Sequence, residues 1–275
     1  MIATMRKQLS RMRTEIDALR TATVRNPTLE AIGADGAEIL TRAGLTPDFW
    51  QTRLLRSSHD RVLICASRQS GKSTVSAALA LKTALLSESL VLLVSPSLRQ
   101  SAELLLKVLA LYRDIGRPIP TARPKDNALR LDLANGSRIL SLPGTEATIR
   151  GFSGPALIVA DEAARIEDSL IAAIRPMLAV SNGSLICVSS AYAKTGWFYE
   201  EWIGENRWER VCVKATDCPR ISPDFLAEER KALGPRYFGA EYLCEFGELT
   251  DSVFKYEDIT AAMQDDVEPL FSEGA

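Results

Sequence analysis

The chain has 275 residues, of which 46% are hydrophobic and 25% are charged, and its formal net charge is −2. This length and apolar content are sufficient for one large domain, with or without appendages. Because the charge is nearly balanced, the chain as a whole lacks the basic excess that is typical of nucleic-acid-binding proteins. A basic stripe on one face is still compatible with a neutral total. No run of about 18 apolar residues occurs, so we expect no membrane span, and the basic N-terminus lacks the apolar core of a secretory signal.

Cysteine and histidine give little support for a zinc site. The only histidine is His59, and the five cysteines have no zinc-ligand spacing. Cys65 and Cys187 lie inside apolar runs, where a buried thiol behaves as a small hydrophobic side chain. This usage suits a reducing compartment, so we expect a cytoplasmic protein.

Residues 1–22 are predicted to form a basic helix. Apolar residues recur there at alternating spacings of three and four, in a heptad-like seam made of Ile2, Met5, Leu9, Met12, Ile16 and Leu19. Three interpretations stay open: packing on the core with a solvated basic face, contact with a partner or a second copy, and a basic arm on DNA. An Asn-Pro pair ends this helix, and a weaker helix is expected over 28–43, interrupted by Gly33 and Gly36.

A glutamine precedes the first predicted strand. Gln51 lies about fifteen residues before Ala66, and from such a position its amide can read the edge of an adenine base. The alternative is a surface amide that binds no ligand.

Residues 66–74 read ASRQSGKST and follow the apolar run VLIC, which predicts a strand, a phosphate-binding loop and a helix. The pattern G-x-x-x-x-G-K-[ST] is broken only at its first glycine, where Ala66 stands. We expect Lys72 to reach the β- and γ-phosphates of ATP and the Ser73 hydroxyl to hold Mg²⁺. The alternative is a chance strand and helix with a surface lysine. The candidate nucleotide-binding residues here are Gln51, Ser67, Gln69, Ser70, Gly71, Lys72, Ser73 and Thr74.

A second motif supports the first. The run ALIVA at 156–160 fits a strand buried on both faces, and it ends in Asp161 and Glu162. Two carboxylates at that position are costly unless a cation or water shares them. We expect Asp161 to contact the Mg²⁺ shell and Glu162 to polarise the attacking water. Capping of the next helix is the alternative for either residue.

The remaining elements alternate between strands and helices. We expect helices over 72–86, from after Ser97 to about Tyr112, and over 167–179, 222–233 and 235–246. Strands are expected over 90–94, 184–191 and 208–213, with a hairpin of 129–133 and 138–142. This order predicts a P-loop NTPase fold, an αβα sandwich with a mostly parallel sheet of the additional-strand, catalytic-glutamate type. The expected organisation is an N-terminal helical appendage (1–44), an ATPase domain (45–250) and a C-terminal tail (251–275). The phosphate loop, the acidic pair and Ser189–Ser190 all fall at strand ends, where ligands bind in such sheets.

These motifs together resemble the ATPase domain of phage large terminase subunits, the motors that package double-stranded DNA into proheads. The resemblance covers roughly residues 45–255. The segments that carry it are FWQ (49–51), SRQSGKS (67–73), NGS (135–137), RG (150–151), IVADEAA (158–164) and VSSA (188–191).

The resemblance implies further roles and partners. Ser189 and Ser190 would match the coupling motif that senses the γ-phosphate, and Arg68 would match a loop arginine that contacts phosphate. Arg150 would match an arginine before the acidic strand, a candidate finger inserted into a neighbouring subunit's site; a structural arginine is the alternative for each. The implied partners are double-stranded DNA, a homo-oligomeric ring on a portal, and a small terminase subunit, in the cytoplasm of a phage-infected or prophage-carrying host. Candidate DNA contacts are Arg11, Arg13 and Lys107.

A complete terminase also carries a nuclease domain after the ATPase. Only about two dozen residues follow residue 250, so we expect no nuclease activity from this chain. It would be an isolated domain, a truncated prophage gene, or a motor whose nuclease is a separate chain.

Two other functions compete with a packaging motor. A two-lobed helicase needs a second lobe of roughly 150 residues, whereas 113 residues follow Glu162. A binding or scaffold protein with a degenerate, inactive loop is the second, and the intact Lys72, Ser73, Asp161 and Glu162 argue against it. A truncated prophage relic that binds ATP but does not assemble stays open.

Overall fold

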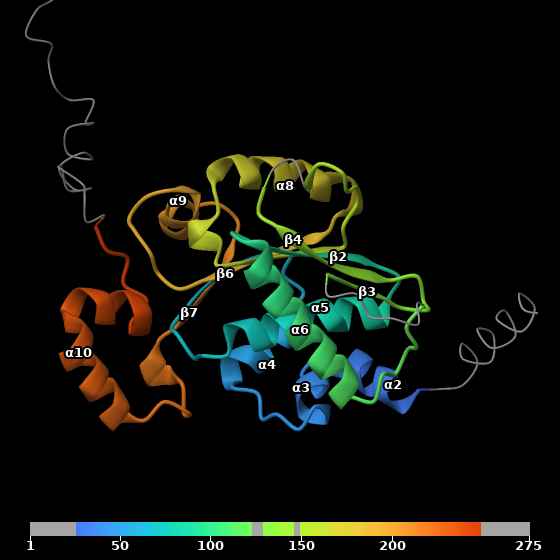
Figure 1. Ribbon diagram of the computed structural model, residues 1–275, viewed down its shortest axis with the longest axis horizontal. Coiled ribbons are helices and arrows are strands. Elements are labelled where there is room, and N and C mark those ends of the chain that lie inside the picture. The colour runs from blue at the N-terminus through green and yellow to red at the C-terminus, as the bar shows by residue number, and fades with distance from the viewer. Residues whose placement is uncertain (1–25, 123–128, 146–148, 249–275) are drawn as a thin grey trace, which may run out of the picture.

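The computed structural model describes residues 26–122, 129–145 and 149–248, which surround a seven-stranded sheet (Figure 1). The strand order is β3-β4-β2-β5-β6-β1-β7. Neighbouring strands are parallel except β3 and β4, which are antiparallel. The strands are β1 (Arg61–Ala66), β2 (Leu90–Ser95), β3 (Arg130–Asp132), β4 (Arg138–Pro143), β5 (Leu157–Asp161), β6 (Ser184–Ser189) and β7 (Glu209–Val213).

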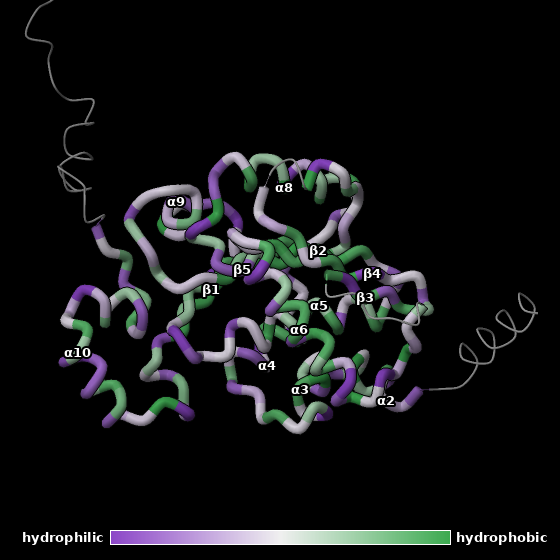
Figure 2. The backbone as a smooth tube through the Cα atoms, viewed as in Figure 1, coloured by the Kyte–Doolittle hydropathy of each residue, from purple (hydrophilic) through white to green (hydrophobic). Residues whose placement is uncertain are grey.

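Helices cover both faces of this sheet (Figure 1). On one face lie α5 (Lys72–Leu86) and α6 (Leu98–Asp114), and on the other lie α8 (Asp168–Ser181) and α9 (Trp197–Ile203). Val62 and Ile64 of β1 point into the core on the α5 side, and Leu63 between them points into the core on the α8 side. This double burial explains the continuous apolar runs of the sequence, and Figure 2 shows the central strands among the most hydrophobic parts of the backbone.

The topology confirms the predicted fold class. Strand β6 lies between β1, which precedes the phosphate loop, and β5, which ends in the acidic pair; this is the additional-strand arrangement. The predicted hairpin is also present, with Leu131 of β3 opposite Ile139 of β4. Because β1, β5 and β6 are parallel neighbours, their carboxyl ends meet at one edge of the sheet.

From residue 26 on, three short helices precede β1. They are α2 (Pro27–Ala34), α3 (Glu38–Arg42) and α4 (Phe49–Arg56). Ile32, Ile39 and Leu40 are completely buried in the core on the α5 side. The helix predicted over 1–22 and the tail after residue 250 lie outside the described residues, so the predicted domain boundaries stay predictions.

The C-terminal part of the described chain is a bent helix, α10 (Pro223–Tyr242). The bend is at Gly234, whose φ of 72° is outside the helical region, and Pro235 follows it. The sequence predicted two helices here, 222–233 and 235–246; the structure ends the second at Tyr242. In the part of the chain that the structure describes, no helix has the length and hydropathy that a membrane crossing requires.

Candidate functional site

The loop between β1 and α5 has the conformation that phosphate binding requires. Gly71 caps α5 with a φ of 90°, and Gln69 also has a positive φ of 59°. A Cβ on residue 71 would lie 2.4 Å from Nε2 of Gln51, so only glycine fits there. The Ser70 hydroxyl donates to the Ser67 carbonyl over 2.7 Å and fastens the loop across its base. Ala66, where the motif usually has glycine, is the last residue of β1 and is fully buried.

Lys72 lies inside this loop. Its Nζ donates to the carbonyls of Ala66 and Ser67, both at 3.0 Å. Because these carbonyls belong to the loop itself, the ammonium group is held where the phosphates of a nucleotide would lie. Ser73 and Thr74 follow in the first turn of α5.

Gln51 is buried rather than exposed, with 3% of its surface accessible. Its Oε1 accepts from the backbone N–H of Asp48 over 2.9 Å, and its Nε2 donates to the Gly71 carbonyl over 3.4 Å. Gln51 therefore joins the start of α4 to the phosphate loop. Arg220 joins the same segments, since it donates to Asp48 over 2.6 Å and to the Ser70 carbonyl over 3.1 Å.

The acidic pair occupies the end of β5. Asp161 is 8% exposed, and its Oδ1 is a buried atom with no hydrogen-bond partner among the described residues. Burial, reinforced by the neighbouring Glu162, raises the pKa of Asp161 to about 6. Glu162 has a left-handed conformation with φ of 53°, which costs on the order of 1 kcal/mol for a residue with a Cβ.

These residues fit a magnesium ion. Ser73 and Asp161 line one cavity of about 500 Å³, together with Glu162. A hydroxyl and a carboxylate are the hard oxygen ligands that Mg²⁺ prefers, and a cation would relieve the desolvated, unpartnered Asp161 oxygen.

A second cavity of about 730 Å³ adjoins the phosphate loop and brings the predicted residues together. Its walls include Lys72, Ser73, Glu162 and Ser190. Ser189, at the end of β6, is buried, and its Oγ has no partner among the described residues. The loop, the acidic strand and the predicted coupling motif therefore meet around one space.

Arg68 lines this cavity, but its guanidinium is engaged by α10. Its Nε lies 2.8 Å from Oε2 of Glu241 and its Nη2 lies 3.3 Å from Oε1. The backbone N–H of Arg68 donates to the Glu241 carbonyl as well. For the predicted contact with phosphate, the Arg68 guanidinium would therefore have to break or share its ion pair with Glu241.

Arg150 lies on the connection between β4 and β5 and is exposed. Neither of the two cavities around the loop includes it among its lining residues. Lys107, a candidate for DNA contact, does line both of them, and Arg11 and Arg13 lie outside the described residues.

Two residues of the phosphate cavity that have polar or charged side chains were not identified from the sequence. Gln100, in the first turn of α6, and Arg165, three residues after Glu162, both line it. The position of Arg165 directly after the segment DEAA was a signal that could have identified it. The involvement of Glu241, which is distant in sequence, had no such local signal.

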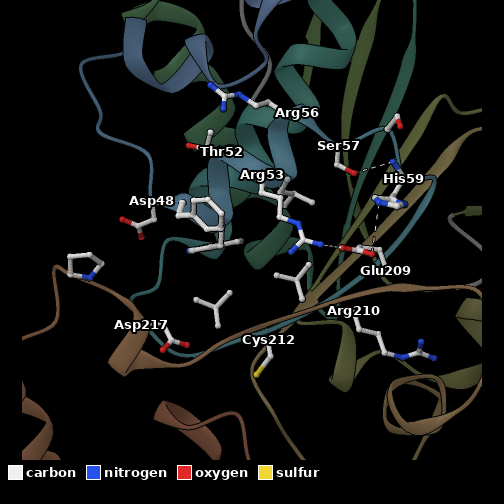
Figure 3. Close-up of a pocket in the computed structure, with 17 residues that line it drawn as sticks. Asp48, Thr52, Arg53, Arg56, Ser57, His59, Glu209, Arg210, Cys212 and Asp217 are labelled. Carbon is white, nitrogen blue, oxygen red and sulfur yellow. Dashed lines mark hydrogen bonds and ion pairs between the residues drawn. The ribbon is translucent and has the colours of Figure 1, made fainter.

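A further cavity lies elsewhere, in a groove of about 840 Å³ between α4 and β7 (Figure 3). Trp50, Val211 and Val213 are among its apolar lining residues. Two of its charged side chains form an ion pair, and Figure 3 shows Arg53 extended toward Glu209, with 2.6 Å between Nη2 and Oε1.

Comparison with known proteins points to one family. Residues 63–261 match the family model "Terminase large subunit, T4likevirus-type, N-terminal". The large terminase subunit of Escherichia phage T5 is 24% identical over 229 residues, which are 78% of this chain and 51% of that protein. The chain thus spans about half the length of the curated relative it matches.

Solved structures share the fold. The ATPase domain of the Thermus phage P74-26 large terminase is similar with a TM-score of 0.65 and 22% identity, over 76% of this chain and 96% of that one. The large terminase of another phage, described as a thermophilic bacteriophage, matches with a TM-score of 0.61 and 14% identity, over 74% of this chain and 54% of that one. The large terminase of bacteriophage HK97 matches with a TM-score of 0.60 and 14% identity, over 77% and 55%.

Proposed function

The chain belongs to the family of T4-type terminase large subunits, and from this membership we propose that it is an ATP-hydrolysing motor that translocates double-stranded DNA into a viral prohead. The observation that carries the proposal is the meeting of Lys72, Ser73, Glu162 and Ser190 around one cavity of about 730 Å³. The large terminase of the thermophilic bacteriophage, which has the same fold, has been solved with ADP and with ATP-γ-S.

The proposed binding of ATP follows from the loop. The N–H groups at the start of α5 and the Lys72 ammonium neutralise the phosphates, with Ser67, Gln69, Ser70, Gly71 and Thr74 as the other loop residues. Gln51 holds the loop against α4 at the position from which we predict that it contacts the base. Ser73 and Asp161 would hold Mg²⁺, which draws charge from the phosphate oxygens when it is bound.

The proposed chemistry is hydrolysis of the terminal phosphate. A water oxygen bonds to the γ-phosphorus while the bond from that phosphorus to the bridging oxygen breaks, so that ADP and inorganic phosphate form. Glu162, which lines the cavity, polarises this water and accepts its proton. Ser189 and Ser190 sense the γ-phosphate, and Arg68 contacts it after exchanging its Glu241 partner.

Arg150 is proposed to act on a neighbouring subunit. It is exposed and does not line the cavities of its own chain, so an Arg150 that reaches a γ-phosphate would do so across an interface in a ring of subunits. The proposed partners are double-stranded DNA, further copies of the chain, the portal and the small terminase subunit.

The test is steady-state ATP hydrolysis against protein concentration, with and without double-stranded DNA. We expect activity to rise faster than linearly with protein and to rise again with DNA. Glu162→Gln should bind ATP with nearly unchanged affinity and lose roughly 10²–10⁴-fold in turnover, because an amide cannot accept the proton. Glu228→Gln, on the exposed surface of α10, is the matched control. Nucleotide binding without hydrolysis at any concentration would identify a nucleotide-binding relic instead.

A further inference from the structure

Arg165 lies at the acidic end of β5 and faces the phosphate cavity. It is the last residue of a short 3-10 turn, η1 (Ala163–Arg165), that begins directly after Glu162. The backbone N–H of Arg165 donates to the Glu162 carbonyl over 2.9 Å. Its side chain lines the same cavity as Lys72 and Ser190. The fold therefore places Arg165 on a wall of the cavity that the proposed general base also lines.

The guanidinium of Arg165 is held by a ring rather than by an acid. Its Cζ lies 4.5 Å from the centroid of the Tyr192 ring. Among the residues that the structure describes, no carboxylate or carbonyl is hydrogen-bonded to its side chain. Stacking uses the face of a guanidinium and leaves the N–H groups at its edge available for an anion. Arg68, in the same cavity, has instead committed its N–H groups to Glu241.

Tyr192 is itself held in place by the segment that follows α10. The backbone N–H of Gly247 donates to the Tyr192 carbonyl over 3.2 Å, and the backbone N–H of Lys194 donates to the Gly247 carbonyl over 2.9 Å. Tyr192 also directly follows Ser190–Ala191, the end of the predicted coupling motif. These bonds fix the backbone at Tyr192, and its partly exposed ring lies against the Arg165 guanidinium.

We propose that Arg165 is a catalytic residue that supplies its guanidinium in cis to the terminal phosphate of bound ATP. The proposal rests on the proposed ATPase function and adds to it an arginine that each subunit provides for its own site. A preorganised donor of this kind stabilises the charge that develops on the phosphate oxygens in the transition state. Tyr192 is a positioning residue that orients it.

The first experiment measures turnover and nucleotide binding together. Arg165→Ala should lower kcat by about 10²–10³-fold. It should weaken binding of ATP-γ-S by about tenfold, the size expected for one lost charge-assisted hydrogen bond, and leave ADP binding unchanged. A structural role would weaken both nucleotides. Arg165→Lys keeps the charge without the planar fork and should recover only part of the loss. Arg113→Ala, at the exposed end of α6, is the control.

The second experiment tests whether Arg165 acts in the site of its own subunit or in that of a neighbouring subunit. Arg165→Ala subunits mixed with Lys72→Ala subunits should show no recovery of turnover, because the first lack the cis arginine and the second cannot bind the phosphates. Recovery on mixing would overturn action in cis, and an unchanged kcat in Arg165→Ala would overturn the catalytic role. A wild-type chain that does not hydrolyse ATP would instead refute the ATPase function, since every comparison uses wild-type turnover as its reference.

Discussion

The phosphate cavity and the α4–β7 groove differ in how their charges are paired. The groove is the larger, at about 840 Å³ against about 730 Å³. Its arginines, Arg53, Arg56 and Arg210, are matched in number by three carboxylates, and two of them form ion pairs, with Glu209 and Asp35. The phosphate cavity has four cationic side chains and a single carboxylate, Glu162, on its walls.

This difference concerns the charge that surrounds the proposed nucleotide site. In the groove the arginines are bound within the protein, Arg210 by backbone carbonyls, so a charged ligand would have to displace existing contacts. In the phosphate cavity Arg68 is paired with Glu241, and the remaining cations, Lys72, Lys107 and Arg165, still outnumber the single lining carboxylate, which favours a polyanion. Unbalanced charge, rather than volume, distinguishes the site, although the groove also contains two buried unpartnered polar atoms, on Asp48 and Trp50.

The largest expected effect concerns whether a neighbour completes the phosphate cavity. Arg150→Ala should lower turnover on the order of 10³-fold, the contribution of an arginine finger. Mixing it with Lys72→Ala subunits should restore part of the activity, because the Lys72→Ala subunit supplies Arg150 to a site that still binds ATP. The measurement is ATP hydrolysis at fixed total protein and varied mixing ratio.

The contrast with Arg165 is the control for that experiment. One arginine variant should be rescued by mixing and the other should not, although both lose turnover alone. If Arg150→Ala shows no recovery at any ratio, Arg150 acts in its own chain or stabilises the fold, and the phosphate cavity needs no neighbour.

The next prediction concerns the free energy of unfolding, which the burial of the Asp161 carboxylate lowers. Burial raises the pKa of Asp161 to about 6, against about 3.9 in an unfolded chain. The folded protein thus binds this proton more tightly than the unfolded chain does. As pH rises from about 4 to 6, ionisation of Asp161 therefore lowers the free energy of unfolding progressively, and the full loss persists above that range. A pKa difference of this size corresponds to about 3 kcal/mol.

Asp161→Asn should therefore raise the free energy of unfolding by about 3 kcal/mol at pH 7.5 in EDTA without nucleotide, while abolishing Mg²⁺-dependent turnover. Urea denaturation at pH 7.5 and at pH 4 measures it, and the gain should vanish at the lower pH. Asp60→Asn, at an exposed position, should change neither value. Equal stability of wild type and Asp161→Asn at pH 7.5 would mean that the site carries no electrostatic cost.

The sequence predicted the parts of this site that depend on local pattern. The strand, loop and helix around Lys72 and the acidic end of β5 have signatures within a few residues, and the additional strand follows from their alternation with helices. The helices α4 and α9 were missed because each is short, at 8 and 7 residues, and has too few turns for a helical period to be seen. The Arg68–Glu241 pair joins residues far apart in the chain, and only the folded backbone brings them together.

The smallest expected effect concerns the α4–β7 groove, where arginines and carboxylates are equal in number. The Arg53–Glu209 pair has a short N–O distance of 2.6 Å, but Arg53 is 67% exposed, so solvent screens it and a double-mutant cycle should give a coupling of about 0.2–1 kcal/mol. Turnover of Arg53→Ala should equal that of the wild type, because the groove arginine contacts a carboxylate and not the proposed phosphate site. If Arg53→Ala instead weakens ATP binding, the groove is part of the nucleotide site, and charge balance is the wrong criterion for separating the two cavities.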